Sequence, residues 1–118
     1  MTTAAGSTPP AAPAGNIRDV GNGRYCLDGT VTMATVTGLR SAGLRAFASG
    51  KGAIEVDLEG VQRADSGGLA LLIDWLAWAR VARRALKYTA VPAALLALAR
   101  LSGVEEMLLD TGGAPPAG

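Results

Sequence analysis

Residues 64–68, with the sequence Ala-Asp-Ser-Gly-Gly, constrain the fold of this chain more than any other stretch. Just upstream, residues 54–58 alternate apolar and acidic side chains, which is the period of a half-buried β-strand. Downstream, leucine and isoleucine recur at helical spacing between Leu69 and Leu76. Because turn-forming residues separate the two patterns, the sequence predicts a strand, a tight turn and a helix over roughly residues 67–84.

The predicted turn places Ser66 at the start of that helix. Asp65 or Ser66 is suited to cap the helix by accepting a hydrogen bond from a free N–H group of its first turn. Gly67 and Gly68 leave little side-chain bulk around the Ser66 hydroxyl, at a helix end whose positive partial charge tolerates a phosphate. Two interpretations stay open: a plain N-cap serine, which the turn residues alone favour, and an accessible hydroxyl with a function.

The composition argues against several classes of function. The 118 residues suffice for one domain, and their formal net charge of +1 comes without a basic tract, so nucleic-acid binding is not expected. Histidine is absent, which excludes histidine-dependent triads, imidazole acid–base chemistry and histidine-ligated metal sites. Cys26 is the only cysteine and is typical of a small buried residue in a reducing compartment. We therefore expect no catalytic residue, no metal and no cofactor.

No segment of the sequence predicts a signal peptide or a membrane span. Residues 1–15 lack the charged start and the continuous apolar core of a signal peptide. The most apolar run, residues 69–79, contains Asp74 and ends at Arg80, so it is too short to cross a bilayer. We expect a cytoplasmic protein without direct membrane insertion.

Small residues and prolines fill both ends of the chain. They predict disordered tails over residues 1–15 and 111–118 and a single folded domain over residues 16–110. The periodic patterns within that domain predict, in order, strands over 17–20 and 24–28, a helix over 33–47, a strand over 54–58, the helix after Ser66, a strand over 85–91 and a helix over 92–101. The last element, residues 104–109, is either a strand or a helical turn. The order predicts an α/β fold, a mixed β-sheet with helices packed on it.

The helix after Ser66 carries two apolar stripes. Its predicted core stripe consists of Leu69, Leu72, Ile73 and Leu76. A second stripe, about 130° away at 100° per residue, consists of Leu71, Trp75, Trp78 and Ala82. Because tryptophan is enriched in binding hot spots, Leu71, Trp75 and Trp78 are candidate partner-binding residues. The alternative is that both tryptophans fill a seam against a neighbouring helix or strand.

Several of these residues resemble the signature of STAS domains, the fold of anti-sigma factor antagonists and of transporter regulators. The matching residues are Val56-Asp57-Leu58, Val61, Asp65-Ser66-Gly67-Gly68-Leu69, Val91-Pro92 and Leu101-Ser102-Gly103-Val104. The resemblance covers about residues 17–109 and implies a STAS-like single domain. Within the family, residues 65–72 are similar to the MlaB-like branch, the cytoplasmic STAS subunits of Mla phospholipid ABC transporters of Gram-negative bacteria.

The resemblance implies a non-catalytic binding protein. MlaB-like subunits bind and support the ATPase of a transporter that maintains outer-membrane lipid asymmetry, so the implied partner is an MlaF-like ATPase subunit beside the inner membrane. The implied contact centres on Ser66, with Asp65, Gly67, Gly68 and the exposed side of the following helix around it. In antagonist relatives the matching hydroxyl is phosphorylated by a partner kinase. The alternative implied function is therefore an anti-sigma factor antagonist that is switched by phosphorylation of Ser66.

Overall fold

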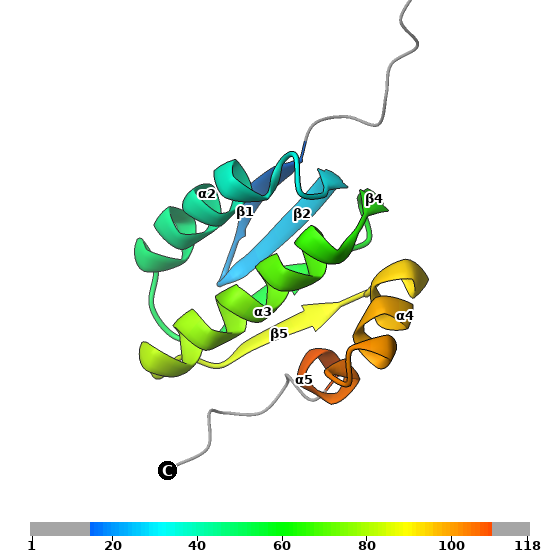
Figure 1. The fold of residues 1–118 in the computed structure, drawn as a ribbon. Helices are drawn as coiled ribbons and strands as arrows, with labels where there is room; N and C mark the ends of the chain where they lie inside the picture. Colours follow the sequence, from blue (N-terminus) through cyan, green and yellow to red (C-terminus); the bar gives the residue numbers. More distant parts are fainter. Residues whose placement is uncertain (1–14, 110–118) are drawn as a thin grey trace, which may run out of the picture.

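The structure, a computed structural model, describes residues 15–109, so the two predicted tails lie outside the described residues except for Gly15. Five strands and four helices make up this described part of the chain (Figure 1). In chain order they are β1 (Asn16–Gly21), β2 (Arg24–Val31), α2 (Val36–Ala48), β3 (Ile54–Asp57), β4 (Val61–Ala64), α3 (Ser66–Val81), β5 (Leu86–Thr89), α4 (Ala93–Leu101) and α5 (Glu105–Leu109).

The strands form one mixed sheet in the order β1-β2-β3-β5. β1 and β2 are antiparallel and form the predicted hairpin, in which Asn22 and Gly23 adopt φ angles of 57° and 77°. The pairs β2–β3 and β3–β5 are parallel, and helices make the crossovers between parallel strands. As a result α2 and α3 lie side by side on one face of the sheet, and α4 and α5 lie beside β5 (Figure 1).

Strand β4 is the element that the sequence pattern did not predict. β3 pairs with Arg24–Cys26 at the start of β2, whereas β4 pairs with Gly29–Val31 at its end. The backbone N–H of Gly29 also donates to the carbonyl of Gly60 in the turn between β3 and β4, at 2.8 Å. β4 thus continues along β2 past the end of β3 and delivers the chain to Asp65. The undecided last element is helix α5.

The core lies between the sheet and helices α2 and α3. Alternate side chains of β2, including Tyr25, Leu27 and Val31, are buried against the helices. Phe47 of α2 makes T-shaped contacts with Tyr25 and with Trp75 of α3, at centroid distances of 5.1 and 5.2 Å. The indole of Trp75 lies against Gly43, where a Cβ atom would stand 2.3 Å from Cζ2 of the ring. A glycine in α2 therefore makes room for the tryptophan of α3.

The buried face of α3 is rotated from the predicted one, with Leu69 and Leu72 buried as predicted. Its buried residues are Gly67, Gly68, Leu69, Leu71, Leu72, Trp75 and Ala79. Ile73 and Leu76, which were predicted for the core stripe, are only half-buried. The large indole of Trp75 removes more apolar surface from water than either of these side chains, and its place beside Gly43 fixes the rotation of the helix.

Substitution of Gly43 tests this packing. Gly43→Ala would force the Cβ atom into the indole of Trp75, so the free energy of unfolding should fall by about 1–3 kcal/mol despite the better helix propensity of alanine. Gly38→Ala is the matched control in the same helix, because a Cβ atom there meets nothing within 4 Å. The control should stabilise the domain by roughly 0.5–1 kcal/mol. Urea unfolding measures both, and equal effects would contradict the account.

The buried hydroxyl of Tyr88 predicts a loss of stability in alkali. It donates to the carbonyl of Leu72 at 2.7 Å, and burial, with the charge of Asp74, raises its pKa well above the usual value. The unfolded chain ionises this group above about pH 10, so stability falls as pH rises through that value. Tyr88→Phe should lower the free energy of unfolding by about 1 kcal/mol at neutral pH and flatten the alkaline decline. Tyr25, whose pKa burial also raises, leaves a smaller residual decline.

Candidate partner-binding site

Ser66 is the first residue of α3 and is exposed. β4 ends at Ala64, and Asp65 follows in an extended conformation with φ −137° and ψ −166°. The hydroxyl of Ser66 makes no hydrogen bond with any residue in the described part of the chain. The turn therefore presents Ser66 to solvent and leaves the capping role to its neighbour.

The carboxylate of Asp65 is the N-cap of α3. Its Oδ1 accepts from the backbone N–H groups of Gly67 and Gly68, at 2.8 and 3.3 Å. The backbone N–H of Met33, in the loop after β2, donates to the same carboxylate at 3.1 Å from Oδ1 and 3.2 Å from Oδ2. One side chain thus satisfies two of the free donors at the start of the helix and ties the helix to a loop 32 residues earlier. A carboxylate already occupies the positive helix end that could have held a phosphate.

Gly67 and Gly68 are buried, and their lack of a side chain lets the backbone of α3 pack closely against the end of β2 and the loop that follows it. A Cβ atom at Gly68 would stand 2.4 Å from the carbonyl oxygen of Val31. A Cβ atom at Gly67 would stand 2.8 Å from both the backbone nitrogen and the sulfur of Met33. The expectation that these glycines themselves contact a partner is corrected, because their contribution is to let the start of α3 sit against the loop that carries Met33.

Met33 belongs to the site, although the sequence pattern had assigned it to a helix. Met33 is 70% exposed, and its side chain lies over Gly67, the residue that follows Ser66. The loop is held by Asp65 and by Thr35, whose hydroxyl donates to the carbonyl of Thr30 at 2.8 Å and accepts from the N–H of Thr32 at 3.0 Å. No local sequence signal marks Met33, because its position depends on a hydrogen bond to a residue far along the chain.

Leu71 and Trp75 do not belong to an exposed surface. Their exposed fractions are 1% and 0%, so the prediction that they contact a partner is wrong, and the seam interpretation holds for Trp75. Trp78 is half-buried. Its ring lies 5.9 Å from that of Phe47, and the guanidinium carbon of Arg84 lies 5.7 Å above it, so this indole packs in the seam between α2 and α3.

The outward face of α3 carries mostly apolar side chains. With Met33 it forms what we call the docking surface, which consists of Met33, Ser66, Ala70, Ile73 and Ala77. The four helical residues are three or four positions apart and so share one face of the helix. Beside them Asp74 forms an ion pair with Arg40 of α2, which joins the two helices at the edge of the surface.

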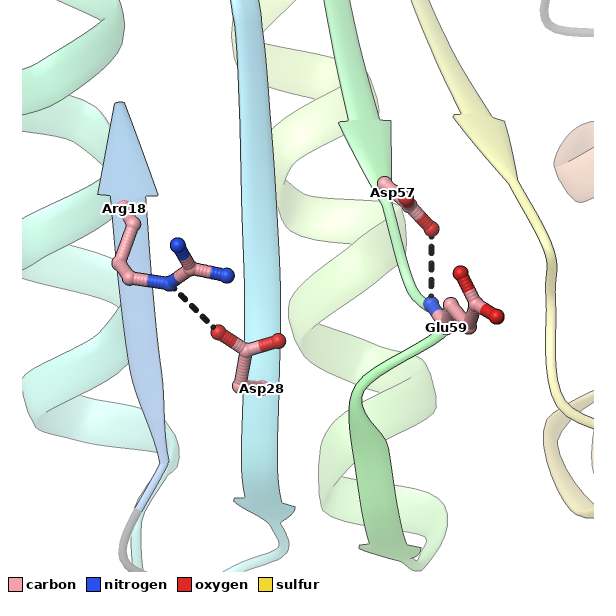
Figure 2. A network of polar contacts seen from close by, with 4 residues as sticks. All are labelled: Arg18, Asp28, Asp57 and Glu59. Carbon is pink, nitrogen blue, oxygen red and sulfur yellow. Dashed lines mark hydrogen bonds and ion pairs between the residues drawn. The ribbon is translucent and has the colours of Figure 1, made fainter. Parts of the chain in front are cut away.

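Three carboxylates of the sheet and its turn lie away from Ser66. Asp28, Asp57 and Glu59 lie on or beside the face of the sheet opposite the helices (Figure 2). Arg18 Nε donates to Asp28 Oδ2 at 2.9 Å, and this carboxylate raises the pKa of Arg18. Asp57 Oδ1 accepts from the backbone N–H of Glu59 at 2.8 Å, which closes the turn before β4. These groups stabilise the sheet and its turn, and none of them is placed to activate Ser66.

The described residues also hold no group of three or more His, Cys, Asp or Glu side chains that could bind a metal ion. In the same part of the chain, no helix has the length and apolar character needed to cross a bilayer.

Comparison with known protein families identifies the fold and the family together. The family described as "Mlab, STAS domain" matches residues 22–110, about three quarters of the chain. The chain therefore belongs to the STAS domain family, in its MlaB-like branch, and the resemblance seen in residues 65–72 is confirmed. Comparison with curated protein sequences gave no match.

Solved structures share the architecture, as two examples show. The anti-sigma factor antagonist SpoIIAA in its unphosphorylated form aligns with a TM-score of 0.63 at 15% identity, over 80% of this chain and 85% of that one. An anti-sigma factor antagonist from Mycobacterium paratuberculosis aligns with a TM-score of 0.61 at 20% identity, over 84% and 87%. At such identities the likeness shows the fold, and it confirms the predicted STAS-like mixed sheet with helices packed on it.

Loss of the Asp65 carboxylate should destabilise the domain more than loss of the Ser66 hydroxyl. Asp65→Ala removes the acceptor of three backbone N–H groups and should lower the free energy of unfolding by about 2 kcal/mol. Ser66→Ala should change it by less than about 0.5 kcal/mol, as expected of an exposed side chain. Urea unfolding of the two variants compares them, and a larger effect of Ser66→Ala would show that the serine, not the aspartate, holds the helix start.

Proposed function

We propose that this chain is a non-catalytic STAS subunit that binds another protein through the docking surface. The observation that carries the proposal is that the exposed hydroxyl of Ser66 and the exposed thioether of Met33 lie side by side on a rigid frame. The carboxylate of Asp65 holds the two backbone segments that carry them. The outward face of α3 continues this surface with small apolar side chains. A protein helix or loop can approach such a face closely, since little side-chain bulk stands in the way.

The proposed partner is the MlaF-like ATPase subunit of a Mla-type phospholipid ABC transporter. Support comes from the family match, whose description carries the MlaB label, and from residues 65–72, which are similar to the MlaB-like branch. In this proposal the chain supports the ATPase of a transporter that maintains outer-membrane lipid asymmetry. It acts in the cytoplasm, beside the inner-membrane part of the complex, without inserting into the membrane.

A second candidate is an anti-sigma factor antagonist that binds an anti-sigma kinase. The observation in its favour is that two solved structures with this fold, SpoIIAA and the protein from Mycobacterium paratuberculosis, are anti-sigma factor antagonists. In this proposal phosphorylation of Ser66 is the switch. The phosphoryl group adds about −1.5 to −2 charges beside the Asp65 carboxylate, which already occupies the N–H groups of Gly67 and Gly68. The added charge therefore opposes docking of an apolar partner and has little reason to unfold the domain.

Charge placed on the docking surface should abolish partner binding. Ala70→Asp puts a carboxylate on the exposed face of α3, and burying it against an apolar partner should weaken binding tenfold or more. Ala97→Asp is the matched control, an exposed alanine in helix α4 that should bind as the native chain does. Affinity is measured with the purified ATPase subunit of the transporter from the same organism. Wild-type affinity of both Ala70→Asp and Ser66→Asp would contradict the proposed surface.

Copurification from the native organism separates the two candidates. Recovery of an ATPase and a permease with the tagged chain supports the transporter, whereas recovery of a serine kinase and a sigma factor supports the antagonist. In either case Ser66→Thr should retain the partner, because threonine keeps the hydroxyl.

A further inference from the structure

Cationic side chains are concentrated where α2 and α3 end. We call this region the basic end of the domain. It consists of the carboxyl-terminal ends of α2 and α3, the first residues of β2 and β5, and the loops next to them (Figure 1). Its basic residues are Arg24, Arg45, Lys51, Arg80, Arg83, Arg84 and Lys87. Its acidic residues are Asp19 and Glu55. The basic end thus carries five net positive charges in a chain whose total is +1, and the rest of the chain is net negative.

Hydrogen bonds hold these elements together. Arg84 Nε donates to the carbonyl of Gly52 at 2.8 Å, and another of its N–H groups donates to the carbonyl of Phe47. This guanidinium therefore joins the end of α3 to the loop that carries Lys51. On the sheet side, Glu55 lies 3.4 Å from Arg24 Nε and 3.5 Å from Lys87 Nζ.

Four of the seven cations have no such structural role. Arg45, Lys51, Arg80 and Arg83 are exposed and form no ion pair with a residue between 15 and 109. The carboxyl-terminal ends of α2 and α3 attract cations, but each contributes only about half a negative charge. Two helix ends therefore leave several of these charges uncompensated.

An apolar side chain lies among the cations. Val81 is 85% exposed and follows Arg80 directly, with Arg83 two residues further on. An apolar centre with a charged rim is the anatomy of a protein interface. Nucleic-acid binding needs a basic track that follows a phosphate backbone, and membrane docking needs a broad apolar face with several large side chains. A group of cations at the end of a helix, with one exposed valine next to Arg80, matches neither.

We propose that the basic end binds an acidic segment of a partner protein, with the carboxylates on Arg80 and Arg83 and an aliphatic side chain against Val81. This contact is separate from the docking surface around Ser66. The 16 residues of α3 set the two about 24 Å apart, at 1.5 Å per residue, so each can be tested without the other.

The test uses the full chain and a fluorescein-labelled helical peptide of glutamate and leucine. The native chain should bind this peptide, and the affinity should fall as salt is raised. Arg80→Glu with Arg83→Glu should weaken binding roughly tenfold or more, and Arg80→Gln with Arg83→Gln should weaken it less. The control is Arg63→Glu, a single charge reversal of the same kind at an exposed site on β4, at the other end of α3. The glutamine pair keeps the test valid if charge reversal lowers stability at the end of α3.

Four results would overturn the proposal. The first would be that the peptide fails to bind. The second would be that the double variants bind the peptide as tightly as the native chain does. The third would be that a DNA duplex, or vesicles of mixed phosphatidylcholine and phosphatidylglycerol, bind more tightly than the peptide. That result would assign the basic end to a nucleic acid or a membrane. The fourth would be that sedimentation shows salt-sensitive self-association that the Arg80 and Arg83 substitutions abolish. That result would mean that the basic end binds the acidic side of a second copy of the chain.

Discussion

The carboxylate of Asp65 is the contact on which the candidate site depends. It caps α3 through Gly67 and Gly68, and through the N–H of Met33 it holds the loop after β2. The two glycines are required for this arrangement because any Cβ atom there would meet the backbone of Val31 or Met33. The exposure of Ser66 therefore follows from a rigid frame whose parts are drawn from three separate elements. A binding site on such a frame loses little conformational entropy when a partner docks.

A second interaction decides which side of α3 faces outward. The indole of Trp75 packs against both Gly43 and Phe47 of α2, and this packing turns the remaining small side chains, Ala70 and Ala77, toward solvent. Core and docking surface are thus two consequences of one helix rotation. The charges are also separated along the axis of α3. The Asp65 carboxylate lies at the start of the helix, and the cations of the basic end lie at its carboxyl-terminal end. A partner that contacts the whole length of α3 meets a hydroxyl at one end and cations at the other.

Local signals in the sequence predicted most of the fold, and contacts between distant residues account for what they missed. The Asn22-Gly23 turn, the alternation in β3 and the capping residues before α3 are each encoded within a few positions. β4 has no such pattern, since it exists by pairing with β2. Two apolar stripes made the rotation of α3 ambiguous, and Gly43, more than thirty positions before Trp75, resolves it. Met33 joins the site for the same reason, through a bond to Asp65 that no short window of sequence can reveal.

The central claim is that a partner protein docks where Asp65 brings Met33 and Ser66 together. Nuclear magnetic resonance of the isotope-labelled chain, titrated with the ATPase subunit, tests this claim most directly. The account predicts that the largest changes in amide signals fall on residues 33, 66, 70 and 73, and that signals of Cys26 and Asp28 on the opposite face of the sheet stay in place. Changes concentrated on that opposite face, or on α4 and α5, with residues 33 and 66 unmoved, would contradict it.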